Sequence, residues 1–491
     1  MGKKLILKAS AGTGKTYRLS LEYIGSLIQG IDFRDILVMT FTRKATSEIK
    51  ERILSFLYQM CFEQDFKEEI ERNLKNIYGE QFIINYAKLK DIYSDIIENK
   101  DKLKIYTIDA FTNMLFKNIV APYLKIYKYE IIDDDGNKEI LTKTFQKLFE
   151  NKEAFNIFRD FLEDNSERDM RKYITMIEKL INERWKFIVI EEGNKTYNKS
   201  FEYSDLDGLI EEFKNIVNII SDIKGYEPEQ MFKKDFKDFW NTSEKKEYIY
   251  EKYDSFLKNT PWNGNKIKNS KKADITVEVD NLTNIYSKLL ENLAKDLFNT
   301  KVIPYENNIL KTIETIYRVY DEIKMREKKF TYTDISNYTF KYLYNKDLGF
   351  IDDDGNLTNE FFEVIDGNIR SIFIDEFQDT SILQWKILKN IIDKSENIIC
   401  VGDEKQSIYG WRGGEKRLFE NLDIIIDADV EILNTCYRSS ENIIKYVNDL
   451  FIDISQNTGN ESSSNWTYIP VKYIEKDYNN YTYIERINYT S

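Results

Sequence analysis

The octapeptide Ala9–Thr16, ASAGTGKT, constrains the fold more than any other stretch, because it follows the apolar run Leu5–Leu7 and precedes a segment of helical spacing. A strand, a glycine-rich turn and a helix start, in this order, form a phosphate-binding loop. Glycines let backbone N–H groups approach phosphate closely, and the N-terminal end of the helix favours negative charge. The loop comprises Ala9, Ser10, Ala11, Gly12, Thr13, Gly14, Lys15 and Thr16, with Ala9 where this motif usually has glycine.

The last two residues of this loop carry its chemistry. Lys15 is expected to contact the outer phosphates of a nucleotide, and the hydroxyl of Thr16 is expected to hold Mg²⁺. A chance glycine-rich turn is the alternative, and the octapeptide alone leaves it open.

A pair of adjacent carboxylates, Asp375 and Glu376, follows the apolar run Ser371–Ile374. Asp375 would hold Mg²⁺ through the water shell of the metal, and Glu376 would polarise the attacking water. Acidic residues often end strands without a catalytic role. Together with the phosphate loop, however, the pair predicts a nucleotide hydrolase.

Composition excludes several other kinds of chemistry. The 491 residues contain no histidine and only three widely spaced cysteines, Cys61, Cys400 and Cys436. His–Cys zinc sites and Ser–His–Asp hydrolysis are therefore excluded, and catalysis must use carboxylates, Lys, Arg, Gln and bound metal. No apolar run reaches the roughly 18 residues of a membrane helix, and no signal peptide is recognisable. We therefore expect a cytoplasmic protein with no membrane partner.

Charge is unevenly distributed along the chain. The net charge is −13, yet residues 1–60 carry ten Lys and Arg against five Asp and Glu. A local basic surface for nucleic acid is one interpretation, and an ordinary solvated face is the other.

Apolar runs of strand length alternate with segments of helical spacing at both ends of the chain. Strands are expected near residues 5–7, 35–40, 104–108, 371–374, 397–401 and 430–433. This alternation predicts an α/β fold, a doubly wound parallel sheet with helices on both faces. Between these parts Pro and Gly are scarce and helical spacing dominates, which predicts a large, mostly helical inserted domain. The expected domains are 1–120 plus 326–428, the insertion 121–325, and a further unit 429–491.

Six ordered motifs accompany the phosphate loop. They are VMTFTRKATSEIKERI (38–53), YTIDAFTNMLF (106–116), FTYTDIS (330–336), FIDEFQDTS (373–381), VGDEKQSIYGWRGG (401–414) and LNTCYRSSENI (433–443). With them the chain resembles the superfamily 1 DNA helicases of the UvrD/Rep type. The loop form ASAGTGKT and Asp109, where UvrD-type members often have His, indicate the RecB/AddA-like branch. The resemblance implies a RecA-like P-loop domain, with 429–491 as the incomplete beginning of a second RecA-like domain.

The resemblance also implies roles for residues outside the phosphate loop and the Asp375–Glu376 pair. Gln406 would contact the terminal phosphate or the attacking water, Arg438 would neutralise charge on the γ-phosphate, and Tyr17 and Tyr437 would enclose adenine. Tyr17 departs from the Arg common in UvrD-type members. Single-stranded DNA would be contacted through base stacking and phosphate contacts; these residues are Thr40, Phe41, Thr42, Thr107, Phe111, Tyr409, Trp411 and Arg412. For Phe41 and Phe111, a place in the core is the alternative.

The resemblance ends after the fourth of the family's motifs. We find no match to the later motifs, to a second insertion or to a nuclease domain, so we expect a truncated, N-terminal portion of a longer helicase. A chain that works with a second helicase-nuclease subunit, and one that binds ATP and DNA without translocating, are the alternatives.

The sequence therefore predicts an ATP- and Mg²⁺-dependent 3′–5′ DNA helicase or translocase of recombination and repair. It would act on single-stranded and partly duplex DNA. The alternative is an ATP- and DNA-binding module without motor activity. A P-loop kinase or transport ATPase is contradicted by the GDEKQSIYGWRGG segment, which those proteins lack.

Overall fold

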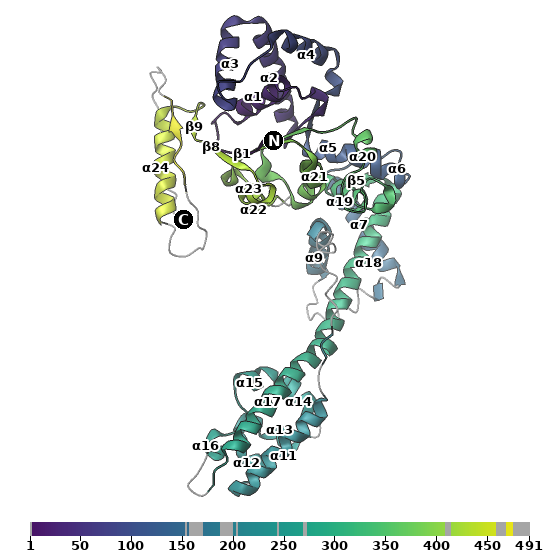
Figure 1. Cartoon of the computed structure of the whole chain (residues 1–491). Coiled ribbons are helices and arrows are strands. Elements are labelled where there is room, and N and C mark those ends of the chain that lie inside the picture. Colours follow the sequence, from purple (N-terminus) through teal and green to yellow (C-terminus); the bar gives the residue numbers. More distant parts are fainter. Residues whose placement is uncertain are drawn as a thin grey trace, which may run out of the picture. The chain divides into compact units, whose positions relative to one another are not determined.

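The computed structural model describes residues 2–152, 155–156, 170–186, 200–202, 205–242, 245–268, 273–407, 414–457 and 468–474. The chain forms two compact units (Figure 1). The first comprises Met1–Glu139, Asn182–Val189 and Lys324–Ser491, and the second comprises Ile140–Ile181 and Ile190–Ile323.

A six-stranded sheet forms the centre of the first unit, and every strand pairing in it is parallel. The strands lie in the order β3-β2-β6-β7-β1-β8. Their bounds are β1 Lys4–Ala9, β2 Ile36–Thr40, β3 Lys104–Thr107, β6 Ser371–Ile374, β7 Asn397–Gly402 and β8 Asp429–Leu433. All six runs expected to be strands are strands, and the predicted doubly wound parallel sheet is confirmed.

Strands β1, β2, β6 and β7 contribute alternate residues to two separate hydrophobic cores, one on each face of the sheet. Leu5 and Leu7 of β1 pack in one core, while Ile6 packs in the other. Side chains alternate across a strand, so continuous apolar runs are what a sheet covered on both faces requires. The central strands β2, β6 and β7 are apolar on both sides for this reason.

Two groups of helices cover the two faces (Figure 1). On the face of Leu5 and Leu7 lie α1 Lys15–Ile28, α2 Arg43–Phe62, α3 Gln64–Tyr78 and α4 Tyr86–Glu98. On the face of Ile6 lie α5 Ile108–Leu115, α6 Ala121–Tyr123, α19 Tyr332–Leu343, α20 Asn359–Val364, α21 Ile382–Lys394, α22 Lys416–Glu420 and α23 Leu422–Ile426. Helices α19 and α21 begin with capping boxes, which satisfy the free N–H groups of their first turns.

A buried ionic cluster keeps three distant segments in the first unit. The Asp334 carboxylate accepts hydrogen bonds from Lys324 Nζ and from Arg184, both at 2.8 Å, and Lys324 also donates to Asn137 at 2.6 Å. Lys324 is fully buried. Although burial opposes ionisation, the two cations hold the pKa of Asp334 below its usual value.

The buried cluster, core packing and strand pairing together place more residues in the first unit than the sequence analysis expects. Residues 121–139 lie in it because Asn137 joins the cluster, Ile126 packs in the core and β4 Glu130–Ile131 pairs with β5 Lys329–Phe330. Strand β8 likewise pairs with β1, so residues 429–433 complete the first sheet rather than begin a further unit.

The second unit is helical in its described residues and has its own aromatic core. Its helices are α11 Leu206–Lys224, α12 Pro228–Met231, α13 Lys237–Asn241, α14 Lys245–Glu251, α15 Tyr253–Lys258, α16 Gly264–Ile267 and α17 Thr276–Leu297. Helices α7 Asp134–Glu150, α9 Met170–Asn182 and α18 Ile303–Glu327 include residues of both units. Phe213, Phe256 and Tyr286 pack at the centre of the core. The predicted helical insertion is confirmed.

A short α/β segment follows β8. Strand β9 Thr435–Cys436 pairs in parallel with β10 Lys472–Tyr473, and α24 Glu441–Asn457 connects them in sequence through residues that are only partly described. Across the described part of the chain, no helix is long and apolar enough to cross a membrane.

The Asp334→Asn substitution should destabilise the first unit strongly. It leaves two buried cations facing a neutral side chain, and such losses cost about 3–5 kcal/mol. Urea unfolding at neutral pH measures the change. Because the pKa of Asp334 is lowered in the folded chain, its contribution is present at neutral pH and disappears as the pH falls through and below roughly 3.9.

Asp353→Asn is the matched control, since the side chain of Asp353 is fully exposed. It should change stability by less than about 0.5 kcal/mol. A loss below about 1 kcal/mol for Asp334→Asn would contradict the role given to the buried cluster.

Candidate functional site

The sequence motifs meet at one edge of the first sheet. Parallel strands bring their carboxyl ends to the same edge, where α/β proteins bind ligands. The phosphate loop follows β1, Phe41 and Thr42 follow β2, Asp375 and Glu376 follow β6, and Asp403 follows β7. Residues far apart in sequence therefore line one site.

The phosphate loop has the backbone that an anion cradle needs. Gly12 and Gly14 have φ angles of +76° and +85°, a region that favours glycine. A Cβ on Gly12 would lie 2.8 Å from Cβ of Arg438 and 3.0 Å from Sγ of Cys436, so only glycine fits. Helix α1 begins after Gly14 with no side-chain cap and no acidic residue in its first turn. Its first N–H groups are thus available to phosphate oxygens.

Lys15 forms an ion pair with Glu376 across the site. Its Nζ donates to the two carboxylate oxygens of Glu376 at 3.0 and 2.9 Å. Lys15 is largely buried, whereas about a third of the Glu376 side chain is exposed. The pair joins the phosphate loop to the end of β6.

Asp375 is an almost fully buried carboxyl beside this pair. Burial, reinforced by the neighbouring Glu376 charge and opposed by Lys15, raises the pKa of Asp375 to about 6. Its Oδ1 accepts the backbone N–H of Glu376 at 3.0 Å. Lys15 compensates this buried carboxylate only in part, and a divalent cation would supply further positive charge.

The residues present fit a Mg²⁺–nucleotide complex. Among the described residues, no cluster of three or more Cys, Asp or Glu side chains could hold a metal without other ligands. Mg²⁺ commonly uses one or two protein groups together with phosphate oxygens and water. Asp375 and the Thr16 hydroxyl are a donor set of that size.

Glu376 has a positive φ of 52°, rare for a residue with a side chain. Such backbone conformations cost about 1–3 kcal/mol and gather at functional sites. Its carboxylate also accepts from Nε2 of the buried Gln378 at 2.8 Å. Sequence reasoning did not assign Gln378 any role; its place in the motif FIDEFQDTS was the available signal.

Gln406 lies in the turn after β7, held by an aspartate. Its Nε2 donates to Asp403 Oδ2 at 2.7 Å, and Lys405 Nζ contacts Asp403 Oδ1 at 3.0 Å. Gln406, the expected sensor of the terminal phosphate, is thus tied to the end of β7. Gln378 Oε1 accepts the backbone N–H of Asp403 at 3.0 Å and connects this turn to Glu376.

Tyr437 and Arg438 reach the phosphate loop from the chain that follows β9. The backbone N–H of Tyr437 donates to the Gly12 carbonyl at 2.8 Å, and the Arg438 side chain lies against Gly12. Strand β8 is itself held to α1 by Arg18, which forms two hydrogen bonds to Glu431 at 2.7 and 2.8 Å.

The two tyrosines expected to enclose adenine both lie near the start of α1. Tyr17 accepts a hydrogen bond from Asn73 at 2.7 Å and meets the Phe56 ring edge-on at 5.4 Å. A Cβ on Gly14 would lie 3.8 Å from the exposed Tyr437 ring. Both residues border the loop, and their enclosure of adenine stays a prediction.

The candidate DNA residues divide into accessible and buried groups. Thr42 and Thr107 cap α2 and α5 at the sheet edge, where Thr42 is exposed and Thr107 half-buried. Phe41 is also half-buried.

Two other DNA candidates are buried. Phe111 is 1% exposed and belongs to the core, so the structure corrects its assignment as a base-stacking residue. Thr40 is fully buried, and its hydroxyl bonds to the Thr42 carbonyl and to Thr46, which corrects its assignment as a phosphate contact. Tyr409, Trp411 and Arg412 lie outside the described residues.

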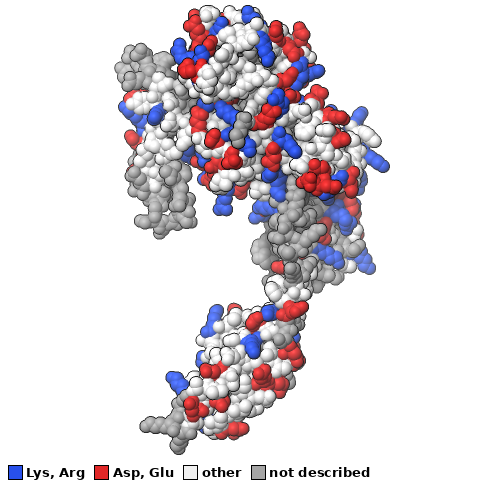
Figure 2. All heavy atoms as spheres, viewed as in Figure 1, with Lys and Arg blue, Asp and Glu red and all other residues white. Residues whose placement is uncertain are grey.

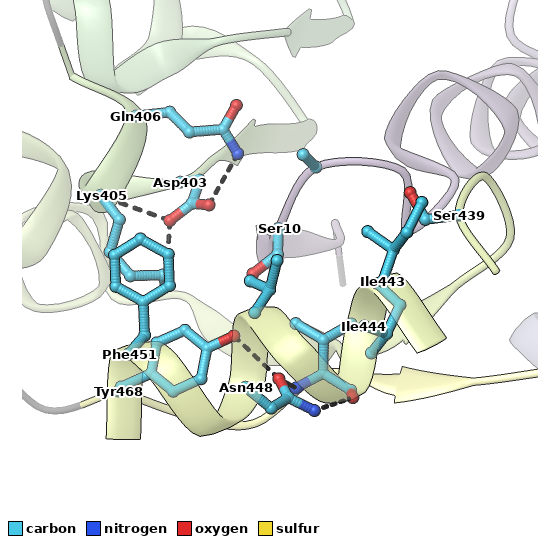
Figure 3. A pocket seen from close by; sticks show the side chains of 13 residues that line it. Ser10, Asp403, Lys405, Gln406, Ser439, Ile443, Ile444, Asn448, Phe451 and Tyr468 are labelled. Carbon is cyan, nitrogen blue, oxygen red and sulfur yellow. Dashed lines mark hydrogen bonds and ion pairs between the residues drawn. The ribbon is translucent and has the colours of Figure 1, made fainter. Parts of the chain in front are cut away.

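A cavity of about 380 Å³ opens between the phosphate loop and α24 (Figure 3). Ser10 and Gln406 line its polar side, and Ile444 and Phe451 of α24 line its apolar side. Tyr468 stacks on Phe451 and donates to Asn448 at 2.8 Å. The α24 segment therefore forms one wall of a cavity at the candidate site.

Charged side chains of both signs are interspersed on the face drawn in Figure 2, where no large patch of a single sign is visible.

The parallel sheet, the glycine-rich loop before α1 and the acidic pair after β6 define a P-loop nucleotide-binding protein of the RecA-like kind. The chain belongs to the UvrD/REP helicase N-terminal domain family, whose model matches residues 1–424. The family resemblance seen in the sequence is confirmed.

The chain is similar to subunits of helicase-nuclease enzymes, as expected for the RecB/AddA-like branch. It is 25% identical to the exonuclease/helicase subunit RexA of Lactococcus lactis subsp. cremoris (strain MG1363), over 92% of this chain and 39% of the relative. It is 26% identical to RecBCD enzyme subunit RecB of Buchnera aphidicola subsp. Acyrthosiphon pisum (strain APS), over 96% of this chain and 39% of the relative. The chain thus spans about two fifths of the length of these relatives.

Asp375→Asn should stabilise the protein above pH 6 in the absence of nucleotide. Because the pKa of Asp375 is raised in the folded chain, the folded state binds more protons than the unfolded one between about pH 4 and 6, and stability falls as the pH rises through this range. The substitution removes this loss of folding stability, which is on the order of 1–3 kcal/mol at pH 8.

Thermal unfolding of the original protein and of Asp375→Asn between pH 5 and 8 measures this gain in stability. Asp334→Asn is the control of opposite sign. A variant of Asp375 that is less stable than the original chain at pH 8 would show that the carboxylate is favourably compensated without a cation.

Proposed function

We propose that this chain is the ATP-hydrolysing and DNA-binding portion of an ATP-dependent 3′–5′ DNA helicase of recombination and repair. One observation carries the proposal: Lys15, Glu376 and Gln406 converge at the carboxyl edge of a parallel sheet in a member of the UvrD/REP family. Its relatives include proteins named for exonuclease and helicase activity. We propose the helicase half of that description for this chain.

The proposed mechanism begins with the exchange of partners at Lys15. Hydrolysis of ATP breaks the bond between the γ-phosphorus and the oxygen that bridges it to the β-phosphate. Bound Mg²⁺ would supply positive charge that polarises this bond. Lys15 turns from Glu376 to the outer phosphates, while the N–H groups of Gly14–Tyr17 hold the phosphate oxygens. Asp375 and the Thr16 hydroxyl would hold the metal.

The freed Glu376 carboxylate then orients water. Gln378 keeps Glu376 in place after Lys15 has left, and Gln406 contacts the terminal phosphate or the water. Arg438, from beyond β9, neutralises the charge that grows on the γ-phosphate. Tyr17 and Tyr437 are proposed to enclose the base.

DNA is proposed to cross the same sheet edge beside Phe41, Thr42 and Thr107, with Tyr409, Trp411 and Arg412 as further contacts. Stacking on aromatic rings tolerates any base, and phosphate contacts position the strand without reading sequence. Single-stranded and partly duplex DNA are the proposed substrates. A second helicase-nuclease subunit is a proposed partner.

The domain assignment is proposed with altered bounds. Residues 1–139 and 324–433 would form the first motor domain, together with 182–189. The helical unit would be the insertion, and residues from Asn434 onward would begin a second RecA-like unit.

The purified chain should hydrolyse ATP in a reaction that single-stranded DNA stimulates. Glu376→Gln should lower the rate about 100- to 10,000-fold because it removes the group that activates water. Lys15→Ala should lower it about 100- to 1,000-fold because it removes a charge at the phosphates. A steady-state phosphate-release assay, with and without oligothymidylate, measures both.

Asp353→Asn serves as the control for purification and folding. Equal hydrolysis by the original chain and Lys15→Ala would contradict the proposal. DNA binding without any hydrolysis would instead support the alternative of a binding module.

A further inference from the structure

Strand β8 lies at one edge of the described sheet. It is the last strand in the sheet order and pairs in parallel with β1 through residues 429–433. Val430 and Ile432 are 43% and 51% exposed, so they bury little apolar surface that could fix the strand. The register of a strand is weakly specified where its side chains are not buried on one face. A specific side-chain interaction can therefore decide where β8 lies along β1.

The ion pair between Arg18 and Glu431 is such an interaction, and it comes from helix α1. Two nitrogens of the Arg18 guanidinium donate to the two carboxylate oxygens of Glu431 at 2.7 and 2.8 Å. Arginine holds a carboxylate in this two-bond geometry because its fork of donors is planar and rigid. The Arg18 side chain is mostly buried. The pair therefore fastens β8 to the first turn of the helix that follows the phosphate loop.

A buried carboxylate fixes the guanidinium in turn. Glu22, one turn further along α1 and fully buried, accepts from Arg18 Nε at 3.0 Å. Glu22 also accepts from Lys3 Nζ at 2.7 Å and from the Tyr78 hydroxyl at 2.6 Å, so residues before β1 and in α3 restrain it as well. Because Glu22 holds the Nε side of the guanidinium, the outer nitrogens of Arg18 are directed at Glu431.

The segment that follows β8 depends on where this strand ends. Leu433 is the last residue of β8, and the backbone N–H of Tyr437 already donates to the Gly12 carbonyl at 2.8 Å. The Arg438 side chain lies against Gly12. A slip of β8 by two residues would keep each side chain on its face of the sheet but would move the strand end by about 6–7 Å. Such a slip would withdraw Arg438 from the phosphate loop.

We propose that Arg18 is a positioning residue that, through Glu431, sets the register of β8 and so holds residues 434–438 against the phosphate loop. The inference rests on the proposed function, in which Arg438 neutralises charge on the γ-phosphate. Two carboxylates engage the Arg18 guanidinium, so its role is to place Arg438 rather than to bind phosphate. Loss of the pair should lower the rate of hydrolysis more than the affinity for ATP.

Alkylation of Cys436 measures whether the segment stays in place, and it requires no nucleotide. Cys436 is 2% exposed, and a Cβ on Gly12 would lie 3.0 Å from its Sγ, so its thiol is covered while the segment is docked. In Glu431→Ala, iodoacetamide should modify Cys436 about 5-fold faster, as expected for local opening after loss of a partly exposed ion pair. Peptide mass spectrometry measures the rate, and the fully buried Cys400 is the internal control for unfolding.

Steady-state ATP hydrolysis measures whether the position of Arg438 matters for the reaction. Glu431→Ala should lower kcat about 10- to 100-fold, because a catalytic group is misplaced, and should change KM for ATP by less than about 3-fold. In an Arg438→Ala background the same substitution should change kcat by less than about 2-fold, because both substitutions act through one group. A residue with only a structural role would lower the rate in both backgrounds.

Two further variants separate the ion pair from general damage. Asp429→Ala removes another carboxylate from β8, two residues earlier and on the same face as Glu431. Because the Asp429 side chain is exposed, both the alkylation rate and kcat should stay within about 2-fold of the original values. Arg18→Lys keeps the positive charge but not the fork of two donors, and it should behave like Glu431→Ala.

The two measurements decide the inference together. Unchanged alkylation of Cys436 in Glu431→Ala overturns it, and so does a loss of kcat that is equally large in the Arg438→Ala background. An original chain that hydrolyses ATP no faster than Lys15→Ala would defeat the proposed function instead. The alkylation rates would then still decide whether Arg18 and Glu431 hold the segment.

Discussion

The parallel pairing of β1 with β7 and of β7 with β6 is the constraint on which the candidate phosphate site depends. Parallel strands share one carboxyl edge, so residues separated by hundreds of positions meet there. Two hydrophobic cores maintain this pairing by burying alternate side chains of the same strands. The fold therefore supplies the site's geometry, and loops of a few residues supply its chemistry.

The ion pair between Lys15 and Glu376 shows how that chemistry is held in the absence of nucleotide. The two opposite charges neutralise each other. Each side chain is also suited to a second partner, because Lys15 can bind phosphate and Glu376 can orient water. Asp375 is stabilised less well, as the raised pKa shows. A buried acid whose charge is poorly compensated lowers the folding stability of the ligand-free protein, and the same feature favours the binding of a cation.

The sequence predicts the strands and the phosphate loop well because both are local patterns. Each strand is a short apolar run, and the loop requires glycine at two positive φ angles, at Gly12 and Gly14. Strand order, the pairing of β8 with β1 and the burial of Phe111 and Thr40 could not be read locally, because packing of distant segments decides them. The same holds for Gln378, whose partner Asp403 lies on another strand's end.

Calorimetric titration of the purified chain with ATP, ADP and AMP in Mg²⁺ tests the central claim most directly, because the claim concerns a site for phosphate. Affinity should rise from AMP to ATP, since the α1 N-terminus and Lys15 contact phosphate groups. Binding of ATP should weaken when Mg²⁺ is removed. Equal affinity for AMP and ATP, or no binding at all, would contradict the account.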